Sequence, residues 1–179
     1  MAIVAGDIVL RLSTTAGSAG DTTAGTASGS LGKYVSTTVM PATLNGLFDD
    51  VTGAENAAST VDYRCIFVLN NHATLTASAM TIYLASEVAG GTSIAIALDN
   101  IAASAKGSAS AQAALIASET TAPTGVGAFS SPTTDGTGLS IGSLAPGQVK
   151  AVWVRRTAAN SAALSNDGVT LGISFDTPA

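Results

Sequence analysis

The stretch that decides the fold lies near the C-terminus and runs Leu144-Ala-Pro-Gly-Gln-Val-Lys-Ala-Val-Trp-Val-Arg-Arg-Thr157. Pro146 and Gly147 predict a tight turn, because proline presets φ at the second position and glycine supplies the left-handed position of a type II turn. The segment 149–157 is rich in valine, which predicts a strand. We therefore expect a turn that leads directly into a strand.

The same combination of short apolar segments and turn signals recurs along most of the chain. Asn166-Asp167-Gly168 is a strong tight-turn signal between this strand and the last one. The expected strands cover residues 7–14, 63–69, 75–86 (one strand or two), 93–98, 149–157 and 169–175, whereas 129–142 is rich in loops. Because strong helices between strands are missing, the pattern predicts an all-β fold, an antiparallel β-sandwich of jelly-roll or Ig-like type.

Helical patterns are short and few. Residues 41–51 place Leu44, Leu47, Phe48 and Val51 at helical spacing, which predicts a helix of at most two turns. Residues 108–117 are dense in alanine and fit a helix or a strand equally well. We expect one or two short helices at most.

The N-terminal part has a different composition. Residues 15–31 are almost entirely Thr, Ala, Gly and Ser, which is typical of a flexible linker or arm. We therefore divide the chain into an extended N-terminal arm at 1–40 and a sandwich domain at 41–179, and expect the domain to fold without residues 1–31.

Charge and composition bound the function. The chain has 179 residues and a net charge of −5, with 11% charged and 4% aromatic residues. A surface this acidic disfavours nucleic acid as a partner. No apolar run reaches the length of a membrane span, and the start lacks the basic region of a secretory signal. We expect neither a nucleic-acid nor a membrane partner.

Residues that could carry chemistry are scarce. His72, the single histidine, follows Asn70 and Asn71 in an expected turn, and no G-x-S-x-G motif is present. Cys65, the single cysteine, lies in an apolar segment that favours a buried, inert thiol. We expect no enzymatic activity and no cofactor.

One cluster of acidic residues could in principle bind a cation. Asp49, Asp50 and Glu55 offer carboxylates at close spacing, but the EF-hand spacing is absent. A polar helix end leading into a turn explains them better, so we expect no metal site.

Trp153 is the only tryptophan. In an alternating strand, Val152, Val154 and Arg156 share one face, whereas Trp153 and Arg155 share the other. Trp153 can belong to the core or anchor an interface, since Trp and Arg are enriched in binding hot spots. We favour the core, because so few aromatic residues are available to fill it.

Residues 144–157 together with Asn166-Asp-Gly-Val-Thr-Leu-Gly-Ile-Ser-Phe-Asp-Thr177 resemble the ends of β-sandwich proteins encoded in structural gene clusters of tailed bacteriophages. The segments 12–20 and 29–38 are similar to the N-terminal regions of the same group. The resemblance implies a virion structural protein, made in the host cytoplasm, of the capsid decoration (cement) type. Its partners would be the major capsid protein or other virion subunits.

We expect such a protein to be a homo-oligomer, with a trimer favoured. Its partner contacts would include Arg11, Lys33 and Tyr34 in the arm and Arg155 in the strand beside Trp153. Two alternatives remain open at this point. One is a tail, neck or fibre-base protein of the virion, and the other is a stand-alone carbohydrate-binding β-sandwich.

Overall fold

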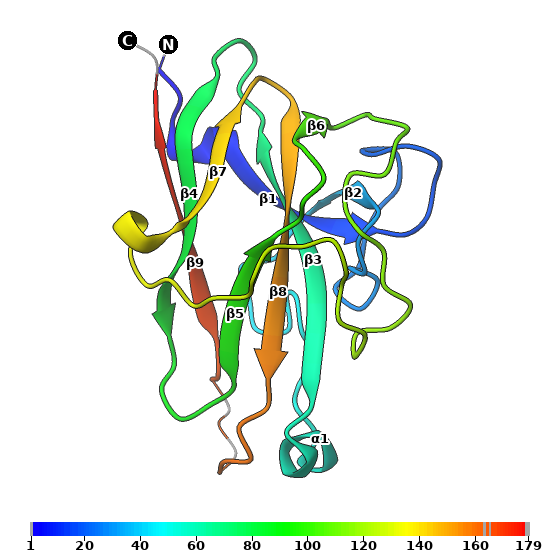
Figure 1. The fold of residues 1–179 in the computed structure, drawn as a ribbon, viewed down its shortest axis with the longest axis vertical. Coiled ribbons are helices and arrows are strands. Elements are labelled where there is room, and N and C mark those ends of the chain that lie inside the picture. The colour runs from blue at the N-terminus through cyan, green and yellow to red at the C-terminus, as the bar shows by residue number, and fades with distance from the viewer. Residues whose placement is uncertain (1, 163, 165, 178–179) are drawn as a thin grey trace.

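The computed structural model describes residues 2–162, 164 and 166–177, and nearly all of its regular structure is β (Figure 1). The single α-helix is α1 (Gly53–Ala58), and two short 3-10 helices are η1 (Ala5–Asp7) and η2 (Asp135–Thr137). The strands are β1 (Ile8–Thr14), β2 (Tyr34–Val39), β3 (Val61–Asn70), β4 (Ala77–Glu87), β5 (Ser93–Leu98), β6 (Ser104–Ala105), β7 (Leu139–Leu144), β8 (Gln148–Thr157) and β9 (Val169–Asp176).

The strands form two antiparallel sheets. The larger sheet has six strands in the order β2-β1-β3-β8-β5, with the short β6 also paired to β8. The smaller sheet has three strands in the order β7-β4-β9. The predicted all-β, antiparallel sandwich is thus confirmed, and the smaller sheet covers only part of the larger one (Figure 1).

The main core lies between the two sheets. The larger sheet contributes Ile66 from β3 and Val152 and Val154 from β8, whereas the smaller sheet contributes Ile82 and Leu84 from β4. All five side chains are buried, and their removal from water supplies the main driving force for joining the sheets.

A second core covers the opposite face of the larger sheet. It contains Trp153, Cys65 and Phe67, and loop residues such as Leu31 and Ile116 pack over them. Both faces of β3 and β8 are therefore buried, which explains the continuous apolar runs at 65–69 in β3 and 151–154 in β8. The predicted alternation along β8 and the predicted burial of Cys65 and Trp153 are confirmed.

The structure does not confirm an extended arm at residues 1–40. β1 pairs with both β2 and β3, so it is an inner strand of the larger sheet. The small residues between β1 and β2 form a folded loop, in which Lys33 N donates to Ala114 O at 3.1 Å. Gly32 has φ of +96°, and a Cβ there would collide with the Ala114 carbonyl. The small residues of this segment thus allow close packing of the backbone. Composition alone cannot distinguish a closely packed loop of small residues from a flexible one.

The prediction of a helix at 41–51 is wrong. This segment forms turns, because Asn45 has φ of +61° and Gly46 lies too close to the Pro41 carbonyl for any side chain. The helix begins instead at Gly53, after a capping box in which Glu55 N donates to Thr52 Oγ1 at 3.2 Å.

Other local predictions have mixed outcomes. Residues 108–117 form neither helix nor strand. The segment predicted as one or two strands at 75–86 is the single strand β4, which bulges near Ala79 at φ +49°. The predicted turn at Pro146-Gly147 is confirmed, with Gly147 at φ +71° and Gln148 N donating to Ala145 O.

Candidate functional site

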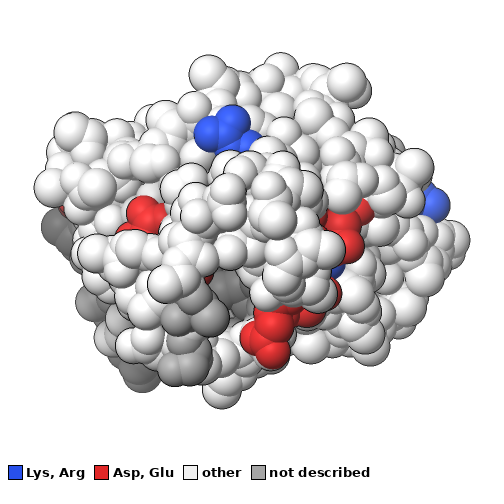
Figure 2. Space-filling view, turned by 90° about the horizontal axis from the view of Figure 1, so that it is seen from below, with Lys and Arg blue, Asp and Glu red and all other residues white. Residues whose placement is uncertain are grey.

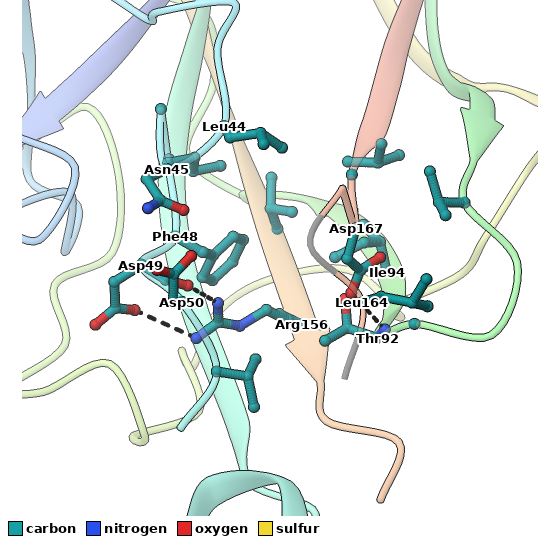
Figure 3. A pocket seen from close by; sticks show the side chains of 18 of the residues that line it. Leu44, Asn45, Phe48, Asp49, Asp50, Thr92, Ile94, Arg156, Leu164 and Asp167 are labelled. Atoms are coloured by element: carbon teal, nitrogen blue, oxygen red, sulfur yellow. Dashed lines mark hydrogen bonds and ion pairs between the residues drawn. The ribbon is translucent and has the colours of Figure 1, made fainter. Parts of the chain in front are cut away.

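A groove opens between the two sheets at the end of the molecule that carries α1 (Figure 3). Its volume is about 1190 Å³. The loop 40–53 forms one wall, and the loop 86–92 together with the start of β9 forms the other. Strand β8 supplies the floor through Val154 and Arg156. The groove exists because the smaller sheet ends at β9 and leaves this part of the larger sheet to the loop 40–53.

Phe48 fixes the loop that forms the first wall. The centroid of its ring lies 4.8 Å from the guanidinium carbon of Arg156 and 5.7 Å from that of Arg64. Arg64 is itself buried and is paired with Glu119. Two cation–π contacts on one ring hold the loop against the larger sheet.

Arg156 is the only basic residue among the described residues that line the groove. Its guanidinium donates to the buried Asp62 carboxylate at 2.8 and 3.2 Å. It also donates to the Asp49 backbone carbonyl, and its Nη2 lies 3.3 Å from the Asp49 carboxylate. Two carboxylates thus already neutralise the single cation of the groove.

The remaining charges on the rim are negative. Asp50 is exposed on the loop 40–53, and Asp167 lies across the groove, where its Oδ2 accepts from Thr92 N at 2.6 Å (Figure 3). Seen from this end, the surface is largely uncharged, with acidic groups at a few separate places (Figure 2). The groove therefore has an acidic rim around a neutralised floor.

The walls of the groove also expose apolar side chains. Leu44 is 61% exposed and projects over the groove from the first wall, and Leu164 is 41% exposed on the other side. Ile94, Val169 and Leu171 line the space between them. Apolar surface that gathers in one concave place is a common mark of a binding site.

The free edge of β9 borders this groove. Among the described residues, β9 pairs only with β4, and no backbone hydrogen bond joins its other edge to another segment. The edges of the larger sheet are different. Thr23 accepts from Thr37 on β2, and Ile96 on β5 exchanges two hydrogen bonds with Ser130. Loops thus cover the outer strands of the larger sheet, whereas β9 stays open.

The residues predicted as partner contacts lie elsewhere. Arg11 pairs with Asp21 at 2.6 Å, and Lys33 lies over the ring of Tyr34 at 4.9 Å. Tyr34 is buried and donates to Ala109 O at 3.0 Å, whereas Arg155 lies over the Phe129 ring at 5.2 Å. None of the four lines the groove, and the structure explains each by contacts within the chain. A role in partner contact stays a prediction for them.

The electrostatic surroundings of Asp21 illustrate such an internal role. Burial works to raise the pKa of its carboxyl, but hydrogen bonds and charges from Lys106 and Arg11 outweigh burial and hold the pKa below its ordinary value. Lys106 Nζ lies 2.9 Å from the Asp21 carboxylate. The carboxylate thus ties the loop after β1 to Arg11 and to the loop after β6.

The two residues that could serve as nucleophile and base have structural roles. His72 Nδ1 accepts from the backbone N–H groups of Thr74 and Leu75 at 3.1 and 3.0 Å, which stabilises the turn before β4. Burial raises the pKa of the Cys65 thiol well above its ordinary value, so the reactive thiolate is disfavoured. They lie on different segments without a contact between them.

Two carboxylates of the acidic cluster considered as a cation site, those of Asp49 and Glu55, interact with other groups of the chain. Asp49 interacts with Arg156, and hydrogen bonds from the Thr52 backbone and side chain hold the pKa of Glu55 below its ordinary value. Within the described part of the chain, no group of three or more His, Cys, Asp or Glu side chains is arranged to hold a metal ion.

Sequence reasoning missed the groove. The spacing of Leu44 and Phe48 predicts one apolar helix face, but the segment forms turns that leave Leu44 exposed and Phe48 partly buried in the wall of the groove. The available signal was the last strand, whose sequence from Val169 to Phe175 carries no charge. An uncharged strand at the end of a chain is a candidate for an unprotected edge.

No family model matches the chain, and the comparisons with curated proteins and with solved structures found no match either. None of the described helices is long and apolar enough to cross a membrane.

Proposed function

We propose that this chain is a non-enzymatic structural subunit of a tailed-bacteriophage virion, of the capsid decoration (cement) type. It binds other virion subunits through the groove and the adjacent edge of β9. The observation that carries the proposal is the combination of an apolar, partly exposed groove with an unpaired strand edge. The resemblance of the sequence to phage structural proteins is the reason for proposing a phage virion as the assembly.

An open strand edge favours a function in assembly. Unpaired N–H and C=O groups of an edge strand can pair with another chain, and monomeric proteins normally block such edges. Here loops block both outer strands of the larger sheet, whereas β9 has no such cover among the described residues. An edge that is left open beside apolar surface is suited to a permanent partner.

The groove is poorly suited to carbohydrate. Carbohydrate-binding sandwiches need exposed aromatic faces, and Phe48 is the only aromatic side chain among the described residues that line the groove. Its ring is already in contact with two guanidinium groups. A tail, neck or fibre-base subunit would use the same groove with a different partner, so it remains the second candidate.

The test is co-sedimentation of the purified chain with phage capsid shells that lack it. We expect saturable, stoichiometric binding and a higher melting temperature of the shell. A chain that stays in the supernatant with shells but sediments with tails would transfer the proposal to a tail subunit. A chain that binds neither would overturn a virion role.

A matched pair of variants tests whether the groove is the binding surface. Leu44→Ser removes an apolar side chain that is 61% exposed in the groove, and Leu115→Ser removes one that is 58% exposed outside it. Both variants should fold, because neither side chain is buried. We expect Leu44→Ser to weaken shell binding at least fivefold and Leu115→Ser to leave it unchanged.

A further inference from the structure

We propose that the groove accepts an extended segment of a different protein, which adds as a strand to the free edge of β9 and carries apolar residues together with lysine or arginine. This inference rests on the proposed function, since it names the chemistry of the partner at the same site. It is independent of which virion component supplies the segment.

The geometry of β9 favours an extended strand. β9 is eight residues long, its first three residues line the groove, and only its last residue, Asp176, is charged. Among the described residues, no backbone hydrogen bond reaches its outer edge. A strand beside β9 would lie about 4.8 Å away in the plane of the smaller sheet, over the part of the larger sheet that β4, β7 and β9 leave uncovered. Main-chain pairing of this kind contributes affinity and places few constraints on the sequence of the added strand.

The groove offers room for the side chains of such a strand. Every second residue of an added strand would point toward the larger sheet, where Leu10 on β1 and Val154 on β8 line the groove. The volume of about 1190 Å³ exceeds the ~300–1,000 Å³ of ordinary small-molecule pockets. Several apolar side chains therefore fit, which favours a peptide segment over a small ligand.

Charge defines the partner further. The described lining contains the carboxylates of Asp49, Asp50 and Asp167 and the single guanidinium of Arg156. Arg156 is already paired with Asp62 as well as Asp49, so the excess charge at the rim is negative. A segment with lysine or arginine at its ends would complement the exposed Asp50 and the half-buried Asp167.

The same charges argue against a second copy of this chain as the occupant. The net charge of each chain is −5. Antiparallel pairing of two β9 edges would bring Asp176 of one copy to the end of β9 that lies next to Asp167 of the other. Like charges at both ends of the pairing would oppose it.

The experiment is hydrogen exchange on the full chain with three synthetic acetylated peptides. The first is Lys-Thr-Val-Thr-Val-Thr-Lys, the second replaces both lysines by glutamate, and the third is the lysine peptide with alternate backbone nitrogens methylated. We expect the lysine peptide to bind one to one and to slow amide exchange in β9 at least tenfold. The glutamate and methylated peptides should bind at least tenfold more weakly.

A pair of variants tests the charge argument. Asp50→Asn should weaken binding of the lysine peptide about threefold to tenfold. Asp7→Asn, which removes a charge outside the groove, should not change it. Absence of binding by the lysine peptide, protection away from β9, or equal binding of all three peptides would overturn the inference.

Self-association is tested by sedimentation velocity. A dimer whose formation protects β9 would show that the occupant is a second copy, which also overturns the inference. Either failure leaves the proposed function standing if the chain still sediments with shells, so the two proposals are tested separately.

Discussion

At the scale of single residues, Asp99 organises the core on the outer face of the larger sheet. Its buried carboxylate accepts from Trp153 Nε1 at 2.9 Å, from Ala114 N at 2.7 Å and from Ile101 N at 2.9 Å. The Lys150 ammonium group donates to the carbonyls of Asp99 and Ile101. One side chain thus connects β8 to the two loops that cover the second core.

Replacement of this carboxylate should be costly. In the variant Asp99→Asn, an NH₂ group replaces one carboxylate oxygen and faces N–H groups that need an acceptor. At least one hydrogen bond to a charged acceptor is therefore lost. We expect the free energy of unfolding to fall by about 2–4 kcal/mol. Urea denaturation measures it, and the control is Asp7→Asn, whose half-buried carboxylate accepts only a local hydrogen bond from Val4 N. A loss under about 0.5 kcal/mol would show that the carboxylate does not hold the loops.

The buried thiol of Cys65 should make the stability of the fold depend on pH. Burial raises the pKa of its thiol in the folded state, so the folded state keeps its proton when the unfolded state begins to lose its own. The contribution of Cys65 to stability is therefore full below about pH 8.5, the pKa of an unperturbed thiol, and decreases as the pH rises above it.

The variant Cys65→Ala isolates this contribution. Between pH 8 and 10, the free energy of unfolding of the natural chain should fall more steeply than that of the variant, by up to about 1.4 kcal/mol per pH unit. Urea denaturation at several pH values measures the difference. Parallel curves for the two proteins would contradict the assignment of the slope to the thiol.

At the scale of elements, the N-terminal segment belongs to the sandwich. β1 pairs with β3 from Ile8 to Leu12, and Leu12 is buried. β2 contributes Val35 to the second core. Residues 1–40 therefore cannot be removed without exposing an edge of β3 and part of the core beneath it.

Deletion of residues 1–31 should prevent folding. The truncated chain loses β1 completely, and β2 then has no neighbour in the sheet. We expect its near-ultraviolet circular dichroism to lack the Trp153 signal and its thermal transition to lose cooperativity. A truncated chain that unfolds cooperatively near the melting temperature of the full chain would show that residues 1–31 are a separate arm.

The sequence predicts elements better than it predicts their contacts. Alternation and turn signals locate most of the strands, because the pleat and the turn each depend on neighbouring residues. The boundary between arm and domain could not be found this way, since Gly32 is selected by a distant carbonyl on Ala114. The groove could not be predicted from the sequence for the same reason, because it arises from the order of the strands in the sheets and from the turn at Asn45.

At the scale of the whole molecule, the two sheets have unequal roles. The larger sheet has a core on each of its faces and loops along its outer strands, so it serves as the rigid part of the fold. The smaller sheet ends at β9, where pairing groups and apolar surface remain open among the described residues. We infer that stability resides in the first sheet and assembly in the second.

The most direct test of this account is site-specific photo-cross-linking in the assembled particle. A photoreactive residue replaces Thr170, which is exposed on β9, or Gly107, which is exposed where a side chain meets no neighbour. We predict that the probe at 170 forms a high-yield cross-link to a different virion protein and that the probe at 107 does not. Equal yields from the two positions, or a cross-link from 170 only to a second copy of this chain, would contradict it.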